Sequence, residues 1–243
     1  MKKIFIFIFL FAGIQATARE LPMVFQSAFP EGSDAVHGFG QLSVGYGSSL
    51  IRPVGGTGYE SGVTTGITFA GIMEVKAFYS HFFNNSMEPS AYAAGGEISA
   101  TILKPHGHVP GLAFGVISLR DQYSDPSIIG RASLFFDLKS VYVLTTAYVE
   151  KAFGARRDPI DLVVSAAIGG HLNRVLRLTL EYSAQDLEDA WEADEAEGGM
   201  KQFLGLNLGW LAAKDIELAA GLGTDMSFKQ PKPVARFLLR YNF

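Results

Sequence analysis

The chain has 243 residues, with 24 acidic against 20 basic side chains and no cysteine. The absence of cysteine excludes disulfides, thiol catalysis, a lipid-modified cysteine and cysteine-ligated metal sites. The acidic balance argues against nucleic acid as a partner. Beyond the N-terminal segment no apolar stretch approaches the roughly 20 residues of a membrane-spanning helix, which excludes a helical membrane protein.

Residues 1–18 have the order of charges and apolar residues that is typical of a secretory signal. Lys2 and Lys3 precede an apolar run over residues 4–14, and the small residues of A-T-A follow at 16–18. The run is shorter than the roughly 20 residues a spanning helix needs. We expect cleavage after Ala18, which leaves 18 basic against 24 acidic side chains and a net charge of about −6. The alternative is an uncleaved N-terminal anchor.

Residues 19–36 predict a short lead-in before the first regular segment. The segment contains Leu21, Met23, Val24 and Phe25. We interpret it as an irregular periplasmic tail, and the alternative is that these apolar side chains tuck into the mouth of a barrel.

From residue 37 onward the chain alternates apolar and polar side chains with a period of two, as β-strands with two different faces do. The segments run about ten residues, the length of a tilted strand that crosses a membrane. The alternation is poorest at 111–120 and 141–150. The predicted strands lie near 37–47, 59–70, 73–83, 92–103, 111–120, 129–139, 141–150, 160–170, 174–184, 201–211, 214–224 and 234–243.

The connections between these segments alternate in length. Links after even-numbered segments are brief, as at Gly71-Ile72 and Ala212-Ala213, and the longest of them is 104–110. Links after odd-numbered segments are longer and polar, as at 48–59 and 184–200. Outer-membrane barrels have short periplasmic turns and longer outer loops. A soluble β-sandwich has no reason to sort its loops in this way, so the sequence predicts an all-β transmembrane antiparallel β-barrel of about 12 strands over 37–243.

The last segment carries the most specific motif. Val234 to Phe243 reads V-A-R-F-L-L-R-Y-N-F, so one face is apolar and the other is mostly charged. This segment resembles the C-terminal strand of bacterial outer-membrane β-barrel proteins, which commonly ends in an aromatic residue. The resemblance implies a Gram-negative outer-membrane location, contact with outer-membrane lipid and lipopolysaccharide, and recognition by the barrel assembly machinery. The residues that match this assembly signal are Phe237, Leu239, Tyr241 and Phe243.

If the apolar faces contact lipid, the alternate faces line the lumen. The charged residues assigned to it are six basic and six acidic: Glu74, Lys76, Glu97, Arg131, Asp137, Lys139, Asp161, Arg177, Glu181, Glu217, Arg236 and Arg240. Such a set either pairs across the lumen, giving a closed structural barrel, or lines a water-filled pore, because a bare charge in a narrow interior is costly. Lumen glycines leave space or serve strand curvature: Gly66, Gly169, Gly205, Gly209, Gly221 and Gly223.

Residues 184–199 form an acidic outer loop, for which the sequence allows a divalent-cation site or, as we favour, a solvated acidic face beside lipopolysaccharide. Leu187 and Trp191 indicate a short amphipathic helix there. His106 and His108 lack a nearby third ligand, so we predict no metal site and no cofactor. Arg156 and Arg157 could contact lipopolysaccharide phosphates, and a solvated turn is the default.

Enzymatic barrels offer a further comparison. Outer-membrane phospholipase and lipid A deacylase place a histidine and a serine two residues apart on a strand, and omptin proteases use an Asp-His pair. None of the five histidines has a serine two residues later, and no Asp-His dipeptide occurs. His81 with Ser86 and Glu88 is the best remaining triad material, and nothing in the sequence fixes its geometry. We therefore predict no catalytic residues and no enzymatic activity.

The sequence favours a narrow channel for passive passage of small solutes. A non-conducting structural or adhesive barrel that acts through its outer loops is the second hypothesis, and a lipid hydrolase is the third.

Overall fold

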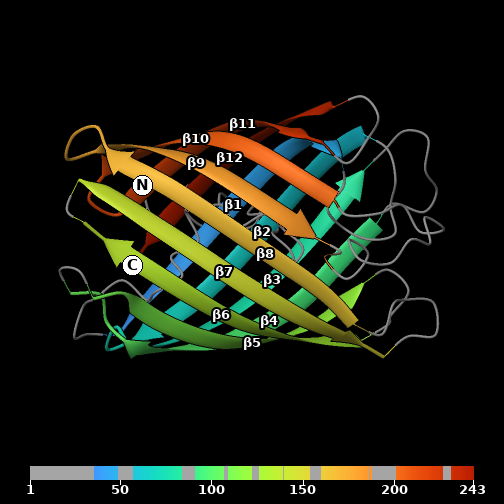
Figure 1. The fold of residues 1–243 in the computed structure, drawn as a ribbon, viewed down its shortest axis with the longest axis horizontal. Coiled ribbons are helices and arrows are strands. Elements are labelled where there is room, and N and C mark those ends of the chain that lie inside the picture. Colours follow the sequence, from blue (N-terminus) through green and yellow to red (C-terminus); the bar gives the residue numbers. More distant parts are fainter. Residues whose placement is uncertain are drawn as a thin grey trace, which may run out of the picture.

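The computed structural model describes residues 36–48, 57–83, 91–106, 109–121, 126–138, 140–153, 160–185, 187, 201–226 and 231–243. These residues form an all-antiparallel closed barrel of tilted strands (Figure 1). The strands are β1 (His37–Ser48), β2 (Thr57–Phe69), β3 (Met73–Phe83), β4 (Ala91–Leu103), β5 (Gly111–Asp121), β6 (Pro126–Asp137), β7 (Val141–Ala152), β8 (Ile160–His171), β9 (Leu176–Gln185), β10 (Lys201–Ala213), β11 (Ile216–Asp225) and β12 (Lys232–Asn242).

Each strand pairs with its neighbours in the sequence, and β1 closes the barrel by pairing with β12. The register of that seam runs from Phe39 opposite Asn242 to Tyr46 opposite Ala235. Beyond it, Gly38 and Phe243 exchange two backbone hydrogen bonds of 2.8 and 2.9 Å. The C-terminal residue therefore takes part in the closure, and no strand edge is left open.

The predicted count of twelve strands is confirmed, and each predicted segment overlaps one observed strand. The predicted ends differ from the observed ones by no more than two residues, except at β6, which begins at Pro126 rather than near 129. In the described part of the chain, no helix is long and apolar enough to cross a membrane.

Side chains along each strand alternate between a buried inward face and an exposed outward face. On β3 the exposed positions include Val75 and Tyr79, whereas Glu74 and Lys76 are buried. The outward face is apolar on every strand, with Leu222 the most exposed of its large side chains at 72%. The fold thus places apolar side chains outside and most of the charged ones inside, the reverse of a soluble domain.

The short connections lie at one end of the barrel, which we call the short-turn end. The β2–β3 turn shows how tight they are: Ala70 and Gly71 have φ values of 51° and 60°, and the Ile72 amide donates to the Phe69 carbonyl at 2.9 Å. Two successive residues with positive φ are typical of a type I′ hairpin turn, whose twist matches that of the strands. The opposite end is called the long-loop end.

The poor alternation at β5 and β7 has a physical cause. On β5, Ile117 and Leu119 face inward and are buried, while Phe114 and Val116 face outward and are exposed. On β7 the inward face likewise carries apolar side chains, Leu144 among them. These strands are apolar on both faces, so a period of two in hydrophobicity is weak although the backbone still alternates.

Closure at Gly38 and Phe243 predicts that deletion of Phe243 destabilises the barrel. The deletion removes two backbone hydrogen bonds and an aromatic ring, for which we expect a loss of about 2–3 kcal/mol in the free energy of unfolding. Urea unfolding of the refolded barrel in detergent micelles measures this loss. Phe243→Leu keeps the backbone bonds and should lose less than half as much, so equal losses in both variants would contradict a role for the backbone pair.

Candidate functional site: the inward face of the barrel

The structure places all the described residues of the predicted lumen set at inward-facing strand positions, with unequal burial. Arg177 and Arg236 are half-buried, and Asp137 is exposed at the short-turn end of β6. Lys139 lies outside the described residues. The buried members are Glu74, Lys76, Glu97, Arg131, Asp161, Glu181, Glu217 and Arg240.

Among the described residues, the inward face carries more acidic side chains than the six assigned to it from the sequence. Glu60, Glu150 and Asp225 also face inward, and Lys232 is the added cation. Glu150 lies on a strand with poor alternation, and Asp225 lies just past the predicted end of β11. The described inward face therefore carries six basic side chains (Lys76, Arg131, Arg177, Lys232, Arg236 and Arg240) and nine acidic ones (Glu60, Glu74, Glu97, Asp137, Glu150, Asp161, Glu181, Glu217 and Asp225).

Four of these charges form a continuous cluster on β3, β4 and β6. The Nζ atom of Lys76 lies 3.1 Å from Glu74 Oε1 and 2.9 Å from Glu97 Oε2. The other carboxylate oxygen of Glu97 lies 2.6 Å from Nη2 of Arg131. All four side chains are less than a tenth exposed. Alternating signs in such a cluster offset the cost of removing each charge from bulk water.

The Glu97–Arg131 contact depends on a glycine between its partners. Glu97 is on β4 and Arg131 on β6, so the pair passes over β5, where Gly115 stands directly opposite Arg131 in the register. A Cβ atom at Gly115 would lie 2.9 Å from Glu97 Oε1 and 3.2 Å from Arg131 Nε. Any larger side chain there would occupy the space in which the two charged groups meet.

A second ion pair repeats this arrangement on the opposite wall. Arg177 on β9 contacts Glu217 on β11, and Gly209 on the intervening β10 is opposite Arg177. Glu217 is also opposite Arg240 of β12 in the β11–β12 register. The carboxylate of Glu217 therefore lies among cationic residues from both sides.

Aromatic side chains use inward-facing glycines in the same way. Tyr142 of β7 hydrogen-bonds through its hydroxyl to Thr179 of β9, and its ring covers Gly169 of the intervening β8. Phe39 of β1 covers Gly66 of β2, and the guanidinium carbon of Arg240 lies 4.3 Å from the Phe39 ring centroid. The sequence predicted that the inward glycines leave space. The structure shows that side chains from neighbouring strands, lying along the wall, fill the space beside Gly66 and Gly169.

The remaining predicted glycines fit this description where the structure gives their surroundings. The Phe203 ring covers both Gly205 and Gly223, and the side chain of Asn207 covers Gly221. A glycine flanked by an aromatic ring in the neighbouring strand recovers part of the packing that its missing side chain costs.

One sector of the inward face is apolar, which the sequence analysis did not predict. Ile117, Leu119, Ile129 and Val163 form a buried cluster with Ala93 and Tyr148, and Phe78 packs against it. The cluster spans β3 to β8 toward the long-loop end. Residues 111–120 are apolar at both odd and even positions, and this pattern in the sequence could have revealed the apolar sector.

The other predicted sites have mixed outcomes. No group of three potential metal ligands occurs among the described residues. His81 is half-buried on the outward face of β3, opposite Ser61 and Tyr92 in the register. The structure describes neither Ser86 nor Glu88, and it likewise leaves out the signal segment, most of the lead-in and the acidic loop, His108, Arg156 and Arg157. Predictions on those residues stay predictions.

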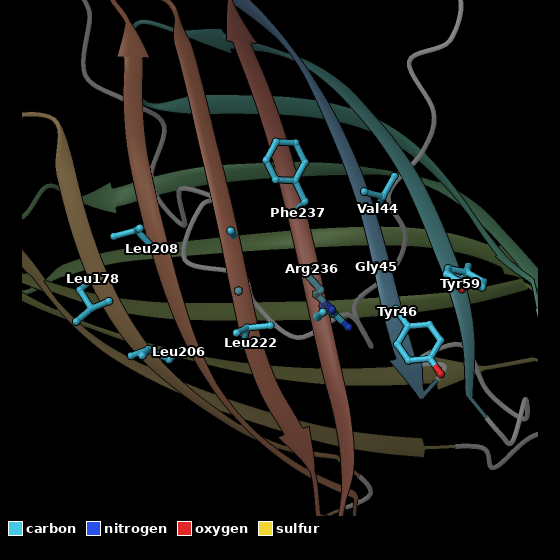
Figure 2. A pocket seen from close by; sticks show the side chains of 13 residues that line it. Val44, Gly45, Tyr46, Tyr59, Leu178, Leu206, Leu208, Leu222, Arg236 and Phe237 are labelled. Carbon is cyan, nitrogen blue, oxygen red and sulfur yellow. The ribbon is translucent and has the colours of Figure 1, made fainter.

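The outward face is hollowed over β9 to β12 and the adjoining β1 and β2. Figure 2 shows leucines of β9, β10 and β11, Phe237 of β12 and the paired rings of Tyr46 and Tyr59 around this depression of about 650 Å³. Ala220 and Ala235 lie among these larger side chains, and their small size leaves the surface hollowed there. The side chains on the outward face of this depression are apolar apart from the tyrosine hydroxyls, as suits a surface that contacts acyl chains rather than a polar solute.

The gap at Gly115 generates a testable prediction. Gly115→Val should displace the Glu97–Arg131 pair and lower the free energy of unfolding by roughly 1–3 kcal/mol, the range for overpacking of a filled site. Urea unfolding in micelles is the measurement. Gly130 on the outward face of β6 is the matched control, because a Cβ atom there meets only a backbone oxygen at 4.0 Å. Equal losses from Gly115→Val and Gly130→Val would contradict the proposed gap.

Comparisons with known proteins agree with this geometry at the level of the fold. No protein-family model matches the chain, and no curated protein matches its sequence. Among solved structures, the barrel is similar to the NanC porin, with a TM-score of 0.62, 9% identity, and coverage of 83% of this chain and 98% of that one. It is also similar to the KdgM porin, with a TM-score of 0.59, 9% identity, and coverage of 84% and 99%. The chain therefore has the closed β-barrel fold of these bacterial porins.

Proposed function

We propose that this barrel is an outer-membrane channel with a narrow, water-filled lumen through which small solutes pass by diffusion. The observation that carries the proposal is the polar and charged lining of the inward face, which a closed barrel of twelve strands encloses. Twelve strands lie between the roughly eight of barrels that side chains fill and the roughly 16–18 of open porins. Charged groups such as Lys76, Glu97 and Arg131 are costly in a narrow interior unless opposite charges or water surround them.

The direction of the ion pairs supports the same proposal. The pairs described above join residues on one strand, on neighbouring strands or on strands two apart in the barrel order. Side chains that pair along the wall leave the axis open, whereas pairs across the lumen would plug it. The wall-parallel arrangement favours the porous alternative over the closed one.

The outward face supports a location in a membrane. Large apolar side chains are exposed on every strand, including Phe237 of β12, and Phe243 directly after β12 is exposed as well. Outer-membrane lipid and lipopolysaccharide are the partners that this surface suits. Recognition by the barrel assembly machinery remains a proposal for Phe237, Leu239, Tyr241 and Phe243, of which Tyr241 and Phe243 stack with ring centroids 6.0 Å apart.

The first experiment is a conductance measurement on the refolded barrel in a planar bilayer. We expect stable single-channel steps and, because the described inward face has more acids than bases, a reversal potential that indicates preference for potassium over chloride. A barrel shown to be folded by its circular dichroism spectrum that nevertheless gives no steps would exclude a diffusion channel. The outer loops would then be the place to look for function.

Arg236 tests whether the inward face sets ion preference. It is half-buried on β12, and its register partners Gly45 and Gly221 have no side chains. Neutralisation in Arg236→Gln removes an inward cation, so the preference for potassium should rise. Arg120→Gln is the matched control, since Arg120 is exposed on the outward face of β5. Equal shifts in reversal potential for both variants would show that Arg236 does not face the ion path.

A further inference from the structure

A small cavity lies at the short-turn end, beside the β8–β9 and β10–β11 turns. Its volume is about 280 Å³. Arg174 and Lys214 come from the two turns, and His171, Arg177 and Glu217 come from the adjoining strand ends. Trp210 and Leu211 of β10 supply apolar wall. The cavity is separate from the ion cluster on β3, β4 and β6.

The charge of this cavity is strongly positive. Three permanent cations line it against one carboxylate, Glu217, and that carboxylate is already in contact with Arg177. Within the residues that the structure describes, Arg174 and Lys214 form no ion pair. Two cations from different turns thus line the same cavity, and neither is paired with an acidic side chain among the described residues. The positive electrostatic potential of such a cavity attracts anions.

The turn that carries Arg174 is held in place by hydrogen bonds. The side-chain oxygen of Asn173 accepts from the amides of Val175 and Leu176, each at 2.9 Å. The Val175 carbonyl in turn accepts from the Leu211 amide of β10 at 2.8 Å. These hydrogen bonds fix the backbone of the turn that carries Arg174, so little backbone entropy is lost when a ligand binds beside it.

We propose that this cavity binds the anionic group of a small solute, a carboxylate or a phosphate, at the short-turn mouth of the barrel. Arg174 and Lys214 bind the anion. Arg177 remains paired with Glu217 and adds to the positive charge of the cavity wall. Binding at this cavity does not require that the barrel conducts, so this inference and the channel can fail independently.

Trp210 provides a direct test, because it lines the cavity and the chain has only one other tryptophan, Trp191. In a Trp191→Phe background, the refolded barrel in detergent micelles is titrated with glucuronate, glucose 6-phosphate or glucose at constant ionic strength, with tryptophan fluorescence as the readout. We expect a saturable change with the anionic sugars and none with glucose. The ratio of the two dissociation constants tells whether a carboxylate or a phosphate is preferred.

The variant Arg174→Ala/Lys214→Ala should raise the dissociation constant of the better ligand about tenfold or more. Lys104→Ala is the matched control, since Lys104 is an exposed lysine in the β4–β5 connection at the same end and does not line the cavity. This control should bind as the parent does. Circular dichroism establishes that each variant is folded. Absence of a saturable change, an equal response to glucose, or unchanged affinity in the double variant would overturn the proposal.

Discussion

The described contacts on this barrel's inward face share one steric condition: where a side chain reaches the strand two places away, the strand between them carries a glycine. The condition holds for Arg131 and Glu97 over Gly115, and for Tyr142 and Thr179 over Gly169. Neighbouring strands lie only about 4.8 Å apart. A side chain on the middle strand would therefore occupy the space in which the two partners meet. The glycines decide which charges can meet.

This condition also explains how charges are tolerated in a confined space. Lys76 and Arg131 share the carboxylate of Glu97, and Arg177 contacts Glu217 on the other wall. Each contact lies along the wall, so the charged groups are partly neutralised without a bridge across the axis. The apolar cluster around Ile117 and Ile129 packs against itself. Charged residues adjoin this cluster, because Glu97 is opposite Ile117 in the register and Glu150 follows Tyr148 on the same face of β7.

The strands could be predicted from the sequence because the outward face of a membrane barrel must be apolar at every second residue, as in Leu204, Leu206 and Leu208. The contacts between inward side chains could not. Whether Arg131 meets Glu97 depends on the register of β4, β5 and β6, and that register shifts at an irregularity between Thr101 and Leu103. Loop lengths in the sequence do not reveal such a shift. Hydrophobic alternation also fails where both faces are apolar, which is why Glu150 was missed on β7.

The distribution of charge along the axis follows from the same contacts. Toward the short-turn end, Glu74 and Glu217 each contact a cation, and Arg174 and Lys214 add positive charge from the turns, at the end that also carries the exposed carboxylate of Asp137. Toward the long-loop end the inward face is acidic among the described residues: Glu60, Glu150, Asp161 and Asp225 lie there with Lys232. In the proposed channel, the fields of these charges would raise the local concentration of cations at the acidic end and of anions beside Arg174 and Lys214. The fixed charges would set which ions enter, whereas the direction of net flow would follow the gradient across the membrane.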